Sequence, residues 1–268
     1  MNKIFITNNP DIAMHSIESG VDIIMVDLET IGKKERQKEF NTVISNHKLN
    51  DIIKIKKCIG NSTLLVRSNP IHKKIREEIE NIINNGADII MLPMFTQVNE
   101  VELFIDIIRG RAKTMLLFET PQSVCRANEI SKLNGIDIAY IGLNDLSIAY
   151  KIDFLFEILS GGIVDFISNS FKKNNIDFGF GGISRLDTGT VNPRLILSEH
   201  IRLGSQYVIL SRSFYNGAQT LNKIKTDINL KLEIDRLNNL YTKLLNTEPK
   251  HIELNRQKLI SEIKKIDL

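Results

Sequence analysis

The sequence has few cysteines, and this absence excludes two kinds of site. Among 268 residues there are only Cys58 and Cys125, which lie far apart. Their separation fits neither a disulfide framework nor the short spacing of cysteine metal sites. Cys125 falls on a predicted helix, where we expect a packed thiol. A reducing cytoplasm is therefore the expected compartment.

Long apolar runs and an excess of one charge are also missing. No apolar stretch approaches the roughly 20 residues of a membrane span, and the N-terminus becomes polar too early for a signal peptide. The 35 basic residues nearly balance the 32 acidic ones, giving a formal charge of +3. Charge therefore favours neither nucleic acid nor a membrane surface as a partner.

Short runs rich in Ile and Val alternate with amphipathic segments along most of the chain. This alternation predicts parallel strands joined by helical crossovers. Eight units in this length favour a closed (β/α)8 TIM barrel, with an open doubly wound sheet as the alternative. No Gly-x-Gly-x-x-Gly follows the first strand, which weakens a dinucleotide-binding version of that sheet. The predicted strands are 4–7, 23–26, 63–66, 89–92, 114–118, 139–141, 177–180 and 207–210.

Helices are predicted between these strands and after the last one. We expect a barrel domain at 1–216 and a C-terminal helical extension at 217–268. The extension packs on a neighbouring subunit or on the outside of the barrel, or forms a partly solvated tail. Predicted helices are 11–19, 33–47, 73–84, 99–109, 122–133, 193–203, 218–245 and 251–266.

Carboxylates stand where two consecutive strands end. Glu119 follows the fifth apolar run, and Asp145 follows the sixth. The carboxyl ends of parallel strands form one open edge, so both side chains are expected to meet there. Two carboxylates can bind Mg²⁺ or Mn²⁺ and leave positions for water and substrate. For Asp145, capping of a helix that begins at Leu146 is a compatible second role.

Other polar groups are predicted at the same edge. Arg67 could hold a substrate carboxylate or a developing enolate oxygen; alternatively, it forms a structural ion pair with Asp27 or Glu29. These two acidic residues could orient water for proton transfer. Backbone N–H groups near Gly142 and Asn144 could hold a substrate carboxylate.

Several further features have simpler interpretations. The glycine cluster Gly179, Gly181 and Gly182 could cradle a phosphate, but tight packing is the preferred interpretation. Arg212 is either an anion ligand or an exposed or interface arginine. The charged run at 33–39 is interpreted as a solvated helix face. None of the histidines is an obvious base: His15, His47 and His72 are predicted at the surface, His200 in a structural position and His251 in the tail.

The combined motifs resemble those of the HpcH/HpaI aldolase and citrate lyase family. They cover most of the chain from about residue 3 to residue 214. The resemblance implies a TIM barrel that forms homo-oligomers and exchanges its last helix. It also implies metal ligation by Glu119 and Asp145, substrate binding by Arg67, and acidic residues at Asp27 and Glu29. The matching segments are VDLE at 26–29, LLVRSNP at 64–70, GADIIMLPMF at 86–95, LLFET at 116–120, IDIAYIGLNDLS at 136–147, FGFGGISRL at 178–186 and EHIRLGSQYVILSRSF at 199–214.

Two positions depart from the pyruvate aldolases of that family. Thr30 stands where they carry an acid–base histidine, and Leu117 where they carry a glutamine. The resemblance therefore implies a metal-dependent carbon–carbon lyase or aldolase acting through a metal-bound enolate of a 2-oxo acid. A lyase of CoA thioesters or phosphorylated acids is one alternative. A catalytically inactive barrel that serves as a binding or scaffold protein is the other.

Overall fold

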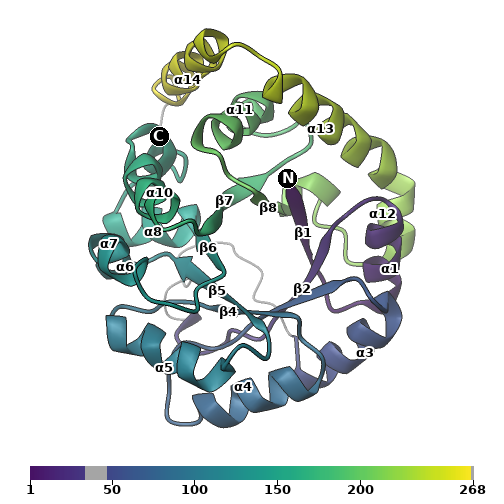
Figure 1. The fold of residues 1–268 in the computed structure, drawn as a ribbon. Helices are drawn as coiled ribbons and strands as arrows, with labels where there is room; N and C mark the ends of the chain where they lie inside the picture. The colour runs from purple at the N-terminus through teal and green to yellow at the C-terminus, as the bar shows by residue number, and fades with distance from the viewer. Residues whose placement is uncertain (34–46, 267–268) are drawn as a thin grey trace.

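The computed structural model describes residues 1–33 and 47–266, which form a closed barrel of eight parallel strands (Figure 1). The strands follow one another around the barrel in chain order, and β1 pairs with β8 to close it. All eight predicted strands and the predicted TIM barrel are therefore confirmed. The strands are β1 (Asn2–Ile6), β2 (Ile23–Asp27), β3 (Thr63–Arg67), β4 (Ile89–Leu92), β5 (Lys113–Phe118), β6 (Ile138–Ile141), β7 (Asp177–Ile183) and β8 (Tyr207–Leu210).

The strands are apolar on both faces because each face is covered. On β2, Ile23 and Met25 point into the barrel interior, whereas Ile24 and Val26 pack against the surrounding helices. Alternate residues of a strand point to opposite faces, so one apolar run supplies two separate cores. This double burial explains why continuous Ile- and Val-rich runs predicted the strands correctly.

The helices surround the barrel, as Figure 1 shows. None of the helices among the described residues has the length and apolar character needed to cross a membrane. The helices are α1 (Pro10–Glu18), α3 (Leu49–Ile59), α4 (Ile75–Asn84), α5 (Val98–Ile108), α6 (Pro121–Cys125), α7 (Ala127–Ile130), α8 (Leu143–Tyr150), α9 (Glu157–Ser160), α10 (Ile163–Lys173), α11 (Pro193–Leu203), α12 (Leu221–Asp227), α13 (Leu230–Leu245) and α14 (Pro249–Ile263), with a short 3-10 helix at Arg212–Tyr215.

Several predicted helix boundaries were wrong. The helix predicted at 122–133 is divided into α6 and α7 at Arg126. The long helix predicted at 218–245 is divided into α12 and α13, because Asn229 accepts a hydrogen bond from the N–H of Leu232 and starts a new helix. The predicted helix at 33–47 lies almost entirely outside the described residues.

The C-terminal helices α13 and α14 pack against α11 of the same chain. Figure 1 shows both helices outside α11. The interface includes partly buried charges: the Arg256 guanidinium lies 3.1 Å from Asp165 Oδ1 and 3.5 Å from Glu199 Oε2. Arg202 pairs with the same two acids. This arrangement matches the predicted packing on the outside of the barrel, while exchange of the last helix between subunits stays a prediction.

His200 is buried on α11, in the structural position expected for it. Its ring stacks on Phe180 with centroids 3.8 Å apart, and its Nδ1 lies 2.8 Å from Ser205 Oγ. Burial lowers the pKa of His200 from 6.5 to about 3, because the apolar surroundings disfavour the charged ring.

This histidine is expected to make the protein less stable in mild acid. Below pH 6.5 the unfolded chain binds a proton at His200 that the folded protein does not bind until about pH 3. The contribution of His200 to the free energy of unfolding is therefore greatest above pH 6.5. As the pH is lowered from 6.5 towards about 3, it falls by about 1.4 kcal/mol per pH unit. Urea unfolding of the original protein and of His200→Gln at several pH values should show a steeper decline in the original. The exposed His251→Gln is the control, and equal slopes for all three proteins would contradict the assignment.

Candidate active site

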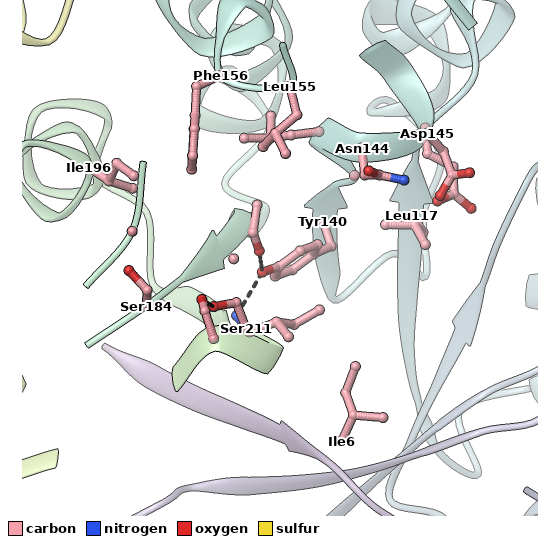
Figure 2. Close-up of a pocket in the computed structure, with 18 of the residues that line it drawn as sticks. Ile6, Leu117, Tyr140, Asn144, Asp145, Leu155, Phe156, Ser184, Ile196 and Ser211 are labelled. Carbon is pink, nitrogen blue, oxygen red and sulfur yellow. Dashed lines mark hydrogen bonds between the residues drawn. The ribbon is translucent and has the colours of Figure 1, made fainter. Parts of the chain in front are cut away.

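A cavity of about 480 Å³ opens at the carboxyl ends of the strands. Its floor is made by side chains of the barrel interior, including Met25, Met91 and Leu117, and its walls by the segments that follow β6, β7 and β8. Figure 2 shows Asn144 and Asp145 at one end of this cavity and Phe156 and Ile196 at the other. The cavity therefore has two ends of different chemical character.

Glu119 lies directly after β5 and lines the cavity although it is only 2% exposed. Its Oε1 accepts a hydrogen bond of 3.1 Å from the N–H of Met94. Met94 has a backbone φ of 54°, which is uncommon for a residue other than glycine. The turn after β4 is therefore conformationally constrained at the point where it supports Glu119. This role of Met94 could not be predicted from the sequence, because nothing in the local sequence signals a positive φ.

Asp145 lies near Glu119 and changes its ionisation. Burial raises the pKa of Glu119 well above its ordinary value of 4.5, and the neighbouring charge of Asp145 raises it further. Arg67 acts in the opposite direction, but does not compensate. Two acidic groups that interact in this way form a site that favours a cation.

Asp145 occupies the third position of α8, so the expected capping role was wrong. The helix begins at Leu143, and Gly142 is its N-cap residue. This earlier start follows from Gly142, whose carbonyl accepts the first helical hydrogen bond, from Leu146. Asp145 therefore projects from the first turn, where a carboxylate is favoured by the helix dipole.

Gly142 is needed because Glu119 is so close. A Cβ at this position would lie 2.9 Å from the Cβ of Glu119 and 3.0 Å from its Oε2. The N–H of Gly142 donates to the carbonyl of Phe118 and is not offered to a ligand. Helix geometry instead leaves the N–H groups of Leu143 and Asn144 without an acceptor inside α8, at the mouth of the cavity.

Arg67, at the end of β3, both forms an ion pair and lines the cavity. Its Nε and Nη2 donate to the two carboxylate oxygens of Asp27 at 2.8 Å each, and its Nη2 lies 3.4 Å from Glu29 Oε2. The predicted ion pair is therefore confirmed, while the predicted binding of substrate by Arg67 stays a prediction. Asp27 and Glu29 are each 2% exposed and do not line the cavity; they contact Arg67, which does. Their predicted role in orienting water for proton transfer stays a prediction.

Lys33 completes this buried cluster, contrary to the predicted solvated face. Its ammonium lies 2.7 Å from Asp27 Oδ2 and 3.6 Å from Glu29 Oε2, and its side chain is 6% exposed. Burial alone would raise the pKa of Asp27, but the charges and hydrogen bonds of Arg67 and Lys33 lower it far below its ordinary value. The rest of the charged run, at 34–39, lies outside the described residues.

Two further expectations were wrong. His47, predicted at the surface, is half-buried, and its Nδ1 accepts a hydrogen bond of 2.9 Å from the backbone N–H of Asp27. The side chain of Cys125, expected to be packed, is exposed because α6 ends there. Neither residue lines the cavity.

The glycine cluster after β7 is explained by packing. A Cβ at Gly179 would lie 2.7 Å from Tyr140 Cε2, and one at Gly181 would lie 2.8 Å from a Leu143 methyl group. The Tyr140 hydroxyl donates to the carbonyl of Gly181 and accepts the N–H of Ile209 (Figure 2). Arg212 is exposed and does not line the cavity. These contacts support the packing interpretation over a phosphate cradle.

A divalent cation fits the carboxylate end of the cavity. Within the described residues no group of three or more His, Cys, Asp and Glu side chains is arranged to hold a metal. The donors here are two carboxylates, a set that Mg²⁺ and Mn²⁺ use when water and substrate complete their coordination. The close approach of Glu119 to Gly142 and the proximity of Asp145 favour such a pair.

The two departures noted in the sequence differ in their relation to the cavity. Leu117 lines the cavity and makes its floor apolar. Thr30 is exposed outside the cavity lining, and its N–H and hydroxyl both donate to Asn69 Oδ1. Consequently, no histidine lines the cavity among the described residues.

Comparison with known proteins identifies relatives of this architecture. The family model described as HpcH/HpaI aldolase/citrate lyase matches residues 4–153. No curated protein sequence matches the chain. Solved structures that resemble it include an HpcH/HpaI aldolase from Desulfitobacterium hafniense, with 15% identity over 78% of this chain and 85% of the other, and a TM-score of 0.61.

Two further solved structures share the fold over more of the chain. The citrate lyase beta subunit from M. tuberculosis, complexed with oxaloacetate and magnesium, is 13% identical over 92% of this chain and 96% of its own, with a TM-score of 0.61. The citrate synthase SbnG is 16% identical over 89% and 94%, with a TM-score of 0.62. At these identities the likeness establishes the barrel fold.

Proposed function

Because the chain belongs to the HpcH/HpaI aldolase/citrate lyase family, we propose that it is a divalent-metal-dependent carbon–carbon lyase or aldolase of a 2-oxo acid. The observation that carries this proposal is the meeting of Glu119 and Asp145 at one end of a cavity that Arg67 also lines. A related fold, the citrate lyase beta subunit, was solved with oxaloacetate, a 2-oxo acid, and magnesium.

Glu119 and Asp145 are the residues that would hold the cation. When bound, Mg²⁺ or Mn²⁺ acts as a Lewis acid that withdraws electrons from the oxygens of the 2-oxo acid. The charges of these two carboxylates repel each other, which contributes to the raised pKa of Glu119. Met94 and Gly142 hold the site in position despite this repulsion. The two carboxylates would therefore need little rearrangement to bind a cation.

Arg67 stabilises negative charge that develops on the substrate. In the cleavage direction, the electrons of the broken carbon–carbon bond form the enolate of the 2-oxo acid, and the other fragment leaves as a carbonyl compound. The Arg67 guanidinium is fixed by Asp27 and Glu29, so its orientation is set before substrate binds. The N–H groups of Leu143 and Asn144 are positioned to receive the substrate carboxylate.

Proton transfer is assigned to water. The hydroxyl proton of the cleaved alcohol and the proton that later reaches the enolate carbon both need a carrier, and the described cavity lining contains no histidine. The Tyr140 hydroxyl is held by Gly181 and Ile209, and burial raises its pKa above its ordinary value of 10, so it is not a base. Water near Glu119 and Arg67 is the remaining carrier.

The proposal is tested by exchange of the pyruvate methyl protons in D₂O, followed by NMR with and without added Mg²⁺ or Mn²⁺. Exchange reports enolate formation and needs no knowledge of the second substrate. We expect exchange that depends on both protein and metal. Absence of exchange with pyruvate, together with no cleavage of oxaloacetate, would refute the proposal and favour the inactive-barrel alternative.

Gly142→Ala is expected to weaken metal binding. The added methyl group would meet Glu119 at 2.9–3.0 Å, so the carboxylate must move from its present position. We expect the dissociation constant for Mn²⁺, measured by calorimetry, to rise at least about tenfold while the circular dichroism spectrum is kept. Asn99→Ala is the control, because Asn99 is an exposed residue of α5 that does not line the cavity. Equal Mn²⁺ affinity in Gly142→Ala and the original protein would show that Glu119 does not depend on this glycine.

A further inference from the structure

All formal charges in the described lining of the cavity lie at one end. Arg67, Glu119 and Asp145 are its only charged side chains among residues 1–33 and 47–266. Arg67 lies in β3, Glu119 directly after β5 and Asp145 in α8. These are the residues assigned above to the metal and the 2-oxo acid. The remainder of the cavity must therefore receive whatever part of the substrate is bonded to the reacting carbon.

The opposite end of the cavity is built from apolar side chains. Phe154, Leu155 and Phe156, in the segment between α8 and α9, form one wall, and Val191 and Ile196 form the facing wall beside α11. Figure 2 shows Leu155, Phe156 and Ile196 on the side of the cavity away from Asp145. The two phenylalanine rings contact each other edge to face, with centroids 5.5 Å apart, which fixes this wall.

The polar groups at this end are uncharged hydroxyls. The Ser184 hydroxyl donates to the carbonyl of Thr188, and the Ser211 and Ser213 hydroxyls lie 2.7 Å apart and bond to each other. Two arginines adjoin these serines in sequence, and neither lines the cavity. Arg185 donates to the Phe214 carbonyl and to Asn216, and Arg212 is exposed. A carboxylate or phosphate group placed here would lose water without gaining a cationic partner.

We infer that the substrate fragment opposite the 2-oxo acid is uncharged and apolar, such as an alkyl or aryl chain, so that the partner carbonyl compound is an apolar aldehyde or ketone. This inference rests on the proposed function, since it takes the 2-oxo acid group to lie at the end marked by Glu119 and Asp145. It excludes three kinds of fragment from this end of the cavity: aldehydes that carry a carboxylate of their own, phosphorylated fragments and CoA-linked fragments.

The test compares two 2-oxo acids of equal length, 2-oxohexanoate and 2-oxoadipate, which end in a methyl group and a carboxylate, respectively. Binding to the Mg²⁺-supplemented protein is measured by calorimetry. We expect 2-oxohexanoate to bind at least about tenfold more tightly, because its chain is buried against apolar side chains. A smaller ratio, a preference for 2-oxoadipate, or no binding of either acid overturns the inference.

Two variants test whether the apolar end of the cavity causes the preference for 2-oxohexanoate over 2-oxoadipate. Thr190 is exposed and lines the apolar end, so Thr190→Lys adds a cation there at little cost to folding. It should increase the affinity for 2-oxoadipate at least fivefold, whereas the matched Thr242→Lys, on the exposed surface of α13, should change neither affinity. Phe156→Ala should lower the affinity for 2-oxohexanoate at least fivefold and leave the affinity for 2-oxoadipate unchanged. Equal behaviour of the two lysine variants would also overturn the inference.

Failure of this inference can be told apart from failure of the proposed function. Exchange of pyruvate methyl protons needs only the charged end of the cavity. If exchange depends on metal but 2-oxohexanoate shows no tenfold preference, the apolar end has been misassigned and the lyase proposal stands. If exchange is absent while 2-oxohexanoate is preferred, the ligand preference stands and the reaction does not.

Discussion

Glu119→Gln is expected to lower metal-dependent exchange of pyruvate methyl protons by about 10³-fold or more. The substitution keeps the shape of the side chain, but removes one of two carboxylates that would hold the cation. A bound metal that stabilises developing charge contributes several kcal/mol, and about 4 kcal/mol corresponds to a thousandfold change in rate. The measurement is the exchange rate by NMR at saturating Mg²⁺ or Mn²⁺, with the exposed Glu129→Gln on α7 as a control.

The same substitution should stabilise the protein when no metal is present. The pKa of Glu119 in the folded protein lies above its ordinary value of 4.5, so the folded state binds the proton more tightly than the unfolded chain. The contribution of Glu119 to the free energy of unfolding is greatest below pH 4.5 and is lost as the pH rises above this value. Glu119→Gln removes this loss, so its thermal midpoint at neutral pH should exceed that of the metal-free original. A lower midpoint together with unchanged exchange would exclude the proposed role of Glu119.

Arg67→Met is expected to lower the free energy of unfolding by about 3–5 kcal/mol, as is typical when one member of a buried ion-pair cluster is removed. Asp27 and Glu29 are each 2% exposed, and without Arg67 only Lys33 would remain as their cationic partner among the described residues. Urea unfolding monitored by circular dichroism measures the change directly. The control is Arg109→Met, because the Arg109 side chain is 67% exposed and its ion pair should contribute little.

Arg67 should also be required for activity in a way that stability does not explain. Arg67→Lys keeps a cation beside Asp27 but loses the paired hydrogen bonds of the guanidinium. We expect this variant to stay folded at 25 °C and to exchange pyruvate protons at least about tenfold more slowly. Full activity in Arg67→Lys would mean that a positive charge suffices and that orientation by Asp27 is unimportant.

The barrel could be predicted from the sequence because its strands are buried on both faces. In β2, for example, residues 23–26 are apolar and buried, and the run ends at Asp27. The same regularity predicted from the sequence alone that Glu119, Asp145 and Arg67 lie at the carboxyl ends of the strands. Residues that follow consecutive strands meet at one rim, so position in the chain is sufficient to bring them together.

Features that depend on tertiary contacts could not be predicted. Lys33 belongs to a charged run, and only the fold shows that its ammonium lies between Asp27 and Glu29. Met94 adopts a positive φ because its N–H is directed at Glu119, a contact between two different strand ends. Local sequence patterns carry no information on either contact.

The apolar end of the cavity was missed for a related reason. Phe154, Leu155 and Phe156 form an apolar triplet that is too short to show the periodicity of a helix or a strand. The structure instead places the triplet between α8 and α9, against Val191 and Ile196. A triplet of this kind between two short helices is the signal that could have indicated a wall of the cavity.

Tyr140 and the backbone of β8 together require glycine at residue 179. A Cβ there would lie 2.5 Å from the carbonyl oxygen of Tyr207 and 2.7 Å from Tyr140 Cε2, and the Tyr140 hydroxyl ties β7 to β8. Because the carbonyl of Tyr207 stays in place whatever residue stands at 140, a smaller side chain at 140 would not admit a larger one at 179. Among homologues, residue 140 should therefore vary in size while residue 179 stays glycine, and substrate size would then evolve through position 140 while the metal-holding rim stays unchanged.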